Sequence, residues 1–355
     1  MEKSHAATRF AAISRSRAAL ILSLTALAIF ACLLASHAGK PPTRLNVSGF
    51  TDPEVLDRIV DRVRHRQGYY QAAGAELRAD GFFVRSVFNW RQPLYAWFLA
   101  IFPSPLIGRL LLGALAILMT LLAVRLSLRL GDQLSAVIAL WLVPGACYGA
   151  FVTWGATTLE ISAGVLIALS IFTYADDHWF LGLLLALTAL FIRELAAPYV
   201  LICIALALVN KRWREIIAWT IGLLCYATYF AFHVSHVLAS VGPTDAPDPS
   251  GWIQFGGLHF ILTTASQHVL FLATPLWVTA LYLPLAVLGL IAIPGSLGRR
   301  ASFTVAIYLI FFAFVGKSFN DYWGFLYSPL LALGFSWAPL TAVHLWKALR
   351  DDLAR

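Results

Sequence analysis

Long apolar runs follow one another along most of this chain, separated by short polar or charged breaks. A run of about 18 apolar residues is long enough to cross the hydrocarbon core of a bilayer. The pattern therefore predicts an all-α membrane protein, a bundle of roughly ten spanning helices. We expect the spans at about 18–36, 105–124, 133–150, 156–174, 179–193, 196–209, 214–232, 269–293, 301–316 and 323–346.

The segment between the first two predicted spans, 37–104, has a different pattern. Thr51-Asp52-Pro53-Glu54 has the composition of a helix start, with a capping side chain, a proline in the first turn and then an acid. Apolar residues from Val55 to Val63 follow helical spacing, with charged residues on the other face. This helix is expected to lie in the plane of the membrane interface, its apolar side toward the lipid.

Two further stretches of 37–104 and a second loop complete the part of the chain outside the spans. Tyr69 to Leu77 predicts another amphipathic interfacial helix. Pro93 to Phe102 is apolar but too short to span, so it is expected to dip into the membrane. Residues 233–268 are rich in proline and glycine and predict a loop on the same side. We expect residues 1–355 to form a single membrane domain with these two insertions.

Composition agrees with a membrane location. The chain has 355 residues, of which 60% are hydrophobic and only 12% are charged, whereas a soluble domain carries about 25% charged residues. The net charge of +8 comes mostly from residues that flank spans, so lipid headgroups explain it and no nucleic-acid partner is expected. The four cysteines lie inside apolar runs without the spacing of metal ligands.

Loop charge predicts the orientation. The basic N-terminus, Arg125 and Arg129, the 211–214 turn, Arg299 and Arg300, and the basic tail all fall on one side of a ten-span bundle. The positive-inside rule makes that side cytoplasmic, with both termini on it. Asp176-Asp177 falls on the same side without a basic neighbour in sequence, and is the weakest point of this topology.

The N-terminal run also resembles a secretory signal, because Ser36-His37-Ala38 could serve as a cleavage site. The run is longer than a usual signal-peptide core, and we therefore expect a retained first span.

Charges at membrane depth are the main indication of function, because they are costly there. Arg193-Glu194 interrupts an apolar run from Leu181 to Val209 and predicts two short helices that meet at the outer face. One interpretation is a tight turn whose ions pair with each other. The other is a site where Arg193 holds a phosphate and Glu194 orients it.

Four other outer residues are candidates for substrate binding. Glu160 falls in the first turn of a span, where the helix dipole also favours an acid. Lys317, Asp321 and Tyr322 fall in the turn between the last two predicted spans. They form either a solvated turn in an aromatic belt or a phosphate or sugar contact, with Lys317 as the charge and Tyr322 as a stacking surface.

The first outer segment supplies candidate catalytic acids. A transferase on this face needs a carboxylate to deprotonate an acceptor hydroxyl group. Asp52, at the predicted helix cap, is the first candidate and Asp61 the second. The alternative is that such acids are solvated partners of neighbouring arginines.

Several short motifs together resemble bacterial members of the GT-C superfamily of integral membrane glycosyltransferases, which includes protein O-mannosyltransferases and lipid A aminoarabinose transferases. They are Gly68-Tyr69-Tyr70-Gln71-Ala72-Ala73, Asn89-Trp90-Arg91-Gln92-Pro93-Leu94-Tyr95 and Phe191-Ile192-Arg193-Glu194-Leu195. The resemblance implies a polyprenyl-phosphate-linked sugar donor at the outer leaflet and a glycan, lipid or protein acceptor. It also implies a base or metal-binding carboxylate at Asp52 or Asp61, and phosphate contacts from Arg193, Lys317 and Arg91.

The sequence departs from the resemblance at one point. Many such enzymes have an acid directly before the tyrosines, whereas Arg66-Gln67 precede Gly68 here. The identity of the base, any divalent cation, the sugar and the acceptor therefore stay open. A lipid-linked sugar flippase and a non-catalytic cell-envelope assembly protein of the same fold are the alternatives. In each case we expect a multi-pass protein of the bacterial inner membrane.

Overall fold

The computed structural model describes residues 8–38, 52–249 and 251–350. It is all-helical, with 79% helix, and within these residues the one β-type contact is an isolated bridge between Ile253 and Val315. The α-helices are α1 (Arg15–Ala38), α2 (Asp52–Arg64), α3 (Tyr69–Ala79), α4 (Pro93–Ala100), α5 (Pro105–Leu130), α6 (Gln133–Ala146), α7 (Leu159–Ala175), α8 (Trp179–Ile192), α9 (Ala197–Val209), α10 (Trp213–Ser240), α11 (Gly257–Ala265), α12 (Leu276–Ala292), α13 (Gly295–Phe314) and α14 (Ser328–Arg350). Short 3-10 turns occupy Val87–Asn89, Tyr148–Phe151, Gly155–Thr157, Glu194–Ala196, Val269–Phe271 and Asp321–Leu326.

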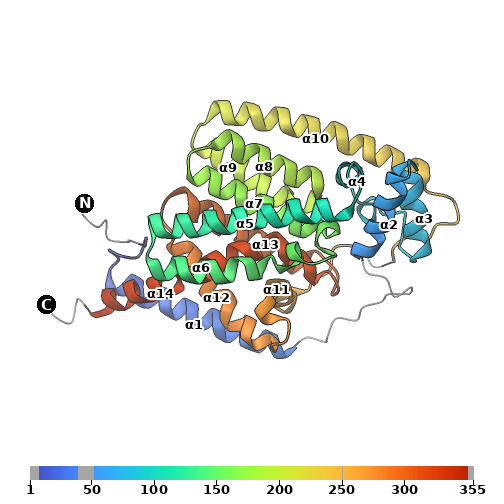
Figure 1. Cartoon of the computed structure of the whole chain (residues 1–355). Coiled ribbons are helices and arrows are strands. Elements are labelled where there is room, and N and C mark those ends of the chain that lie inside the picture. The colour runs from blue at the N-terminus through green and yellow to red at the C-terminus, as the bar shows by residue number, and fades with distance from the viewer. Residues whose placement is uncertain (1–7, 39–51, 250, 351–355) are drawn as a thin grey trace.

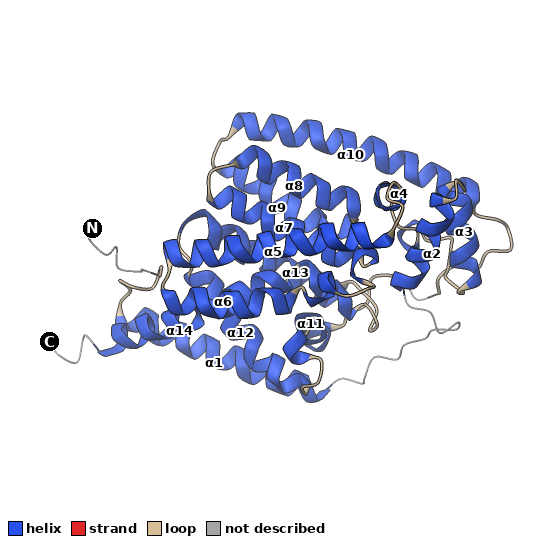
Figure 2. Ribbon diagram, viewed as in Figure 1, coloured by secondary structure: helices blue, strands red, loops and turns tan. Residues whose placement is uncertain are grey.

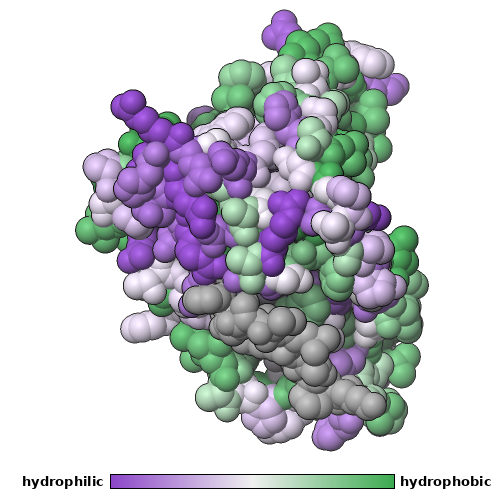
Figure 3. Space-filling view, turned by 90° about the vertical axis from the view of Figure 1, so that its right-hand side faces the viewer, coloured by the Kyte–Doolittle hydropathy of each residue, from purple (hydrophilic) through white to green (hydrophobic). Residues whose placement is uncertain are grey.

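The long helices lie side by side and run along one axis (Figure 1). Both termini lie at the same end of this bundle, which we call the terminus end. The opposite end, which we call the loop end, holds α2, α3, α4 and α11. Figure 2 shows only helices and loops among the described residues. Hydrophilic side chains gather on the loop-end face, with hydrophobic side chains at its margins (Figure 3).

Several helices have the length and composition to cross a membrane. Four of the described helices are at least 18 residues long and sufficiently apolar, namely α1, α5, α10 and α13. Shorter apolar helices of 10–17 residues include α6, α7, α8 and α12. Only 11% of the residues in the most apolar window of α1 are buried within the protein. Its leucines therefore present an apolar surface to the surroundings, as a lipid-facing helix does.

Helix α7 lies at the centre of the bundle, and its residues from Leu159 to Phe172 are all buried. Glycines permit close approach of the neighbouring backbones. A Cβ atom at Gly164 would lie 2.0 Å from the Phe325 carbonyl oxygen, and one at Gly289 would lie 1.9 Å from the Gly334 carbonyl oxygen. Small residues at such contacts are typical of helix packing in membranes.

The predicted helices in the first outer segment are confirmed as α2 and α3, and the 93–102 stretch forms α4. The second predicted loop, 233–268, is partly helical, which the pattern did not predict. Helix α10 continues to Ser240, with Val237 fully buried in its last turns, and α11 forms a further helix. Most predicted span boundaries fall within a few residues of the helices observed.

Candidate functional site

A buried network of three charged side chains lies at the corner between α8 and α9. The Arg193 Nε atom donates to Glu160 Oε1 at 2.8 Å, and Nη1 donates to Glu194 Oε1 at 2.5 Å. The Arg193 and Glu160 side chains are each 2% exposed, and that of Glu194 is 17% exposed. Two of the acids and the arginine predicted at membrane depth are therefore in direct contact.

The local backbone explains this corner. Helix α8 ends at Ile192, and Arg193 is extended, with φ −146° and ψ 118°. A 3-10 turn follows, and Pro198 stands in the first turn of α9, a position that proline favours. The chain thereby reverses direction at Arg193, which turns its side chain toward Glu160 at the start of α7.

Charge decides what Arg193 can do. Buried ions are costly unless they are paired and hydrogen-bonded, and one guanidinium here serves two carboxylates. Arg193 therefore has the partners that the ion-pair interpretation expects. Its proposed phosphate contact stays a prediction, since a phosphate would have to compete with both acids for the same N–H groups.

Gln92 joins this network to the first outer segment. Its Nε2 atom donates to Glu194 Oε2 and to the Tyr226 hydroxyl, each at 3.2 Å. The Gln92 residue is 2% exposed, and its Oε1 atom makes no hydrogen bond within the described residues. The segment between α3 and α4, α10 and the α8–α9 corner are thus held together by one buried amide.

Arg91 continues the network toward the surface of the loop end. The buried Tyr69 hydroxyl donates to the Arg91 carbonyl oxygen, and Arg91 Nη2 lies 3.4 Å from the Tyr322 hydroxyl. The Tyr322 amide donates to Asp321 Oδ1 at 3.1 Å. Arg91 and Tyr322, which are far apart in sequence, are therefore neighbours, Asp321 directly precedes Tyr322, and all three residues are half-buried.

Lys317 lies at the same end in a second ion pair. Its Nζ atom is 2.6 Å from Asp248 Oδ2, and the two side chains are 11% and 7% exposed. The same Nζ atom is 5.2 Å from the centroid of the Trp252 ring, within cation–π range. A carboxylate and an aromatic face thus hold Lys317, and a phosphate contact by this residue stays a prediction.

The two candidate catalytic acids differ in what can be described. Asp52 begins α2 at the loop end, but its side chain lies outside the described part of the chain. The Asp61 side chain is 60% exposed and pairs with Arg64 on its own helix at 3.1 Å and with His65, directly after the helix, at 3.6 Å. This is the environment of a solvated ion-pair partner.

Helix α2 is tied to α3 by other charges. Arg58 binds Glu76 at 2.6 Å and Asp80 at 2.5 Å, and Arg62 binds Glu76 at 2.6 Å. These bonds orient α2 and hence the position of Asp52. Among the described residues, no group of three or more His, Cys, Asp or Glu side chains could hold a metal ion.

Sequence reasoning missed some members of this site. Gln92 stands in one of the quoted motifs but was not singled out, and Tyr226 lies in a long apolar helix. A polar amide beside a proline in an apolar segment was the available signal for Gln92. Tyr226 gave none, because a tyrosine in an apolar run is common.

No family model, no curated protein and no solved structure matches this chain.

Proposed function

We propose that this protein is a membrane glycosyltransferase that moves a sugar from a polyprenyl-phosphate-linked donor to a glycolipid, polysaccharide or protein acceptor on the extracytoplasmic face. The observation that carries the proposal is the gathering at the loop end of the Glu160–Arg193–Glu194 network, Gln92 and the Arg91–Tyr322 contact. Charges at membrane depth indicate function, and here they join the spans to the interfacial segment.

In the proposed topology the spans are α1, α5 to α10 and α12 to α14, with the loop end outside and both termini in the cytoplasm of a bacterium. Basic residues at the terminus end favour this orientation. The weakest point of the sequence-based topology, Asp176, has basic partners after all, because Arg125 and Arg129 both bind it from α5.

The proposed reaction needs a base, a phosphate-binding site and residues that hold the site in position. A carboxylate, Asp52 or Asp61, accepts the acceptor hydroxyl proton as that oxygen bonds to the sugar C1 atom. The bond from C1 to the phosphate oxygen breaks, and polyprenyl phosphate leaves with the electron pair. Arg91 and Lys317 are the proposed phosphate contacts. Arg193 acts as a positioning residue that fixes Glu160 and Glu194.

The test is sugar transfer by purified protein in bilayers that contain polyprenyl-phosphate-linked sugars. Asp52→Asn and Asp61→Asn are made separately, with Asp132→Asn, at the terminus end, as a matched control. We expect one of the two loop-end variants to lose transfer and the control to retain it. Transfer that survives both changes would contradict the catalytic assignment.

The orientation has its own test. Cys225 is exposed and is first replaced by serine. Single cysteines are then placed at Ser318, exposed at the loop end, and at Ser16, exposed at the terminus end. An impermeant thiol reagent added to intact cells should label only the loop-end position. The opposite labelling would exclude a site on the extracytoplasmic face.

The flippase alternative predicts polar groups along a path through the bundle. The central helix argues against it, because Ala163 to Leu169 of α7 are apolar, buried residues between two polar positions, Ser162 and Ser170. Counterflow of labelled lipid-linked sugar in vesicles separates the two. Transport without transfer would favour the flippase, and neither activity would favour an assembly protein.

A further inference from the structure

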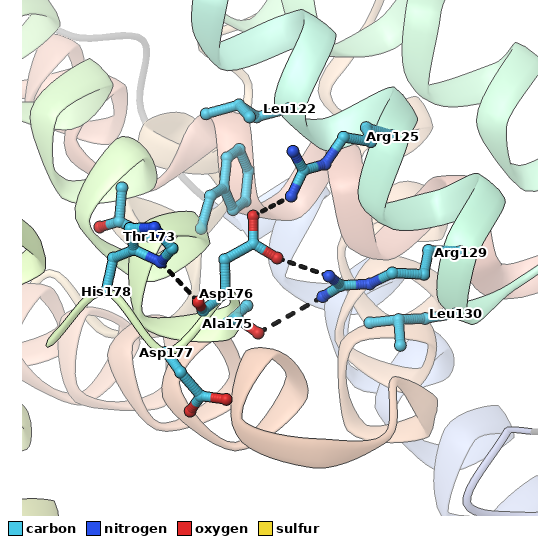
Figure 4. A pocket seen from close by; sticks show the side chains of 10 residues that line it. Leu122, Arg125, Arg129, Leu130, Thr173, Ala175, Asp176, Asp177 and His178 are labelled. Atoms are coloured by element: carbon cyan, nitrogen blue, oxygen red, sulfur yellow. Dashed lines mark hydrogen bonds and ion pairs between the residues drawn. The ribbon is translucent and has the colours of Figure 1, made fainter.

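A surface hollow lies away from the candidate site, at the terminus end. It has a volume of about 650 Å³ and lies where the last turns of α5 face the turn between α7 and α8 (Figure 4). Its lining residues come from the last turns of α5 and from the end of α7 and the turn that follows it.

Two arginines and an aspartate form the polar wall of this hollow. Asp176 lies between Arg125 and Arg129, bonded to Arg125 Nη2 through one oxygen and to Arg129 Nη1 at 2.6 Å through the other (Figure 4). The Arg125 and Arg129 side chains are 57% and 46% exposed. A guanidinium has five N–H donors, so both arginines keep donors for a further anion while Asp176 stays bound.

Asp177 adds an exposed carboxylate that can bind a cationic group. Its side chain is exposed, and it has no ion-pair partner within the described part of the chain. Its backbone has φ 61°, which directs the side chain away from the helical path of α7. The formal charge of the lining, two arginines against two aspartates, is therefore balanced, with one acid unpaired.

An apolar wall completes the hollow. Leu122 and Leu130 line it from α5 and Phe172 from α7. Directly after the hollow, α8 begins with Trp179 and Phe180, whose rings contact edge to face and of which Phe180 is 55% exposed. Aromatic residues at a helix end are typical of the membrane–water interface. The hollow thus combines headgroup-level charges with a surface for an acyl chain.

We propose that this hollow binds a membrane phospholipid whose headgroup carries both a phosphate and a primary ammonium group. The phosphate contacts Arg125 and Arg129, the ammonium contacts Asp177, and the first acyl carbons lie against Leu122 and Leu130. A purely anionic headgroup fits this wall less well, because the arginine charges are already balanced and Asp177 would repel it. The binding does not depend on the proposed transferase activity or on the orientation of the protein.

The test uses the whole protein in nanodiscs made of phosphatidylethanolamine, phosphatidylcholine and phosphatidylglycerol, followed by mild detergent extraction and mass spectrometry of the lipid that stays bound. The wild-type protein should retain phosphatidylethanolamine in preference to both other lipids. Arg125→Gln with Arg129→Gln should lower this retention about tenfold or more, the loss expected for two charge-assisted hydrogen bonds. Arg214→Gln, an exposed arginine at the same end outside the hollow, is the matched control and should change nothing.

Asp177→Asn separates the proposal from a simple anion site. Removal of this acid should abolish the preference over phosphatidylcholine, which has no N–H donor, and should increase retention of phosphatidylglycerol. The residue is exposed and unpaired, so this variant is expected to fold even if the double arginine variant does not. A wild-type preference for phosphatidylglycerol, or equal retention of all three lipids, would overturn the proposal.

Discussion

The two ends of the bundle each bury an arginine beside a glutamate, but the two pairs are built differently. At the loop end, Arg193 lies 2.8 Å from Glu160 and 2.5 Å from Glu194. At the terminus end, Arg300 on α13 and Glu215 on α10 are also almost fully buried, yet their closest atoms are 3.6 Å apart. The first pair is hydrogen-bonded and the second is not.

The terminus-end pair relies on other contacts. The Arg300 guanidinium lies 3.5 Å from the centroid of the Tyr174 ring, and Arg212, 48% exposed, lies 3.6 Å from the other Glu215 oxygen. Within the described residues, both Glu215 oxygens, Arg300 Nη1 and the Tyr174 hydroxyl make no hydrogen bond. The difference shows that burial alone does not define a rigid ionic site. The charged groups of the loop-end network are hydrogen-bonded to one another, whereas the terminus-end cluster keeps buried polar atoms without hydrogen bonds.

The largest effect is expected for Arg193→Met. Glu160 would stay buried at 2% exposure without its partner, and removal of one member of a buried pair costs about 3–5 kcal/mol. Thermal unfolding of the purified protein in detergent, followed by tryptophan fluorescence, should show a large drop in midpoint or a protein that does not accumulate.

A double variant checks the cause. Arg193→Met with Glu160→Leu removes both buried charges and should recover part of the loss, because an apolar pair of similar volume avoids the unpaired ion. Glu194 would still lose its arginine, so recovery should be incomplete. A double variant no more stable than Arg193→Met would indicate that Glu160 does not cause the destabilisation.

A smaller effect is expected for Arg300→Met. This change removes the contact with the Tyr174 ring and a 3.6 Å ion pair, while Arg212 stays near Glu215. We expect a loss of about 2 kcal/mol, the order of a buried cation–π contact. Arg299→Met, at the exposed neighbouring position, is the control and should leave the unfolding midpoint nearly unchanged. Equal losses for Arg300→Met and Arg193→Met would remove the distinction between the two ends.

Much of the helix order could be predicted because membrane spans are specified locally by the length of apolar runs. The corner at Arg193 was also predictable, since two charges interrupt an apolar run of nearly thirty residues. The pairing of Arg193 with Glu160 was not, because it depends on how α7 and α8 pack against each other. Asp176 looked unsupported for the same reason, as its arginines come from α5.

Other parts of the two ends could not be predicted from spacing. Glu215 and Arg300 looked like ordinary charges that flank spans, and only the packing of α10 and of α13 against neighbouring helices buries them. The helical continuation of α10 to Ser240 was hidden by the proline-rich stretch that follows. In each case the missing information is a contact between segments far apart in the chain, and no local pattern carries it.

Gln92→Ala tests how far the closed network at the loop end extends. It removes the bonds to Glu194 and Tyr226, each of 3.2 Å. One amide makes both, and both are long, so we expect a stability loss of about 1 kcal/mol. Sugar transfer should fall by more than stability predicts if Glu194 belongs to the site. Gln71→Ala, exposed on α3, is the control, and an unchanged transfer rate in Gln92→Ala would limit the site to the arginine and its two acids.

The smallest expected effect concerns an exposed ion pair, Arg78–Asp245, which lies outside the proposed spans. The bond from Arg78 to Asp245 lowers the pKa of this carboxyl to about 2. Because the pKa of Asp245 is below the ordinary aspartate value, the interaction is fully present at neutral pH and is lost only as the pH falls through about 2.

The Gly242 amide donates to Asp245 Oδ2 at 2.7 Å, so the hydrogen-exchange protection of this amide reports on the Asp245 carboxylate. Protection should persist below the ordinary titration range of aspartate and should be absent at every pH in Asp245→Ala, which has no side-chain acceptor. Loss of protection near pH 4, the ordinary aspartate value, would show that Arg78 does not hold the carboxylate.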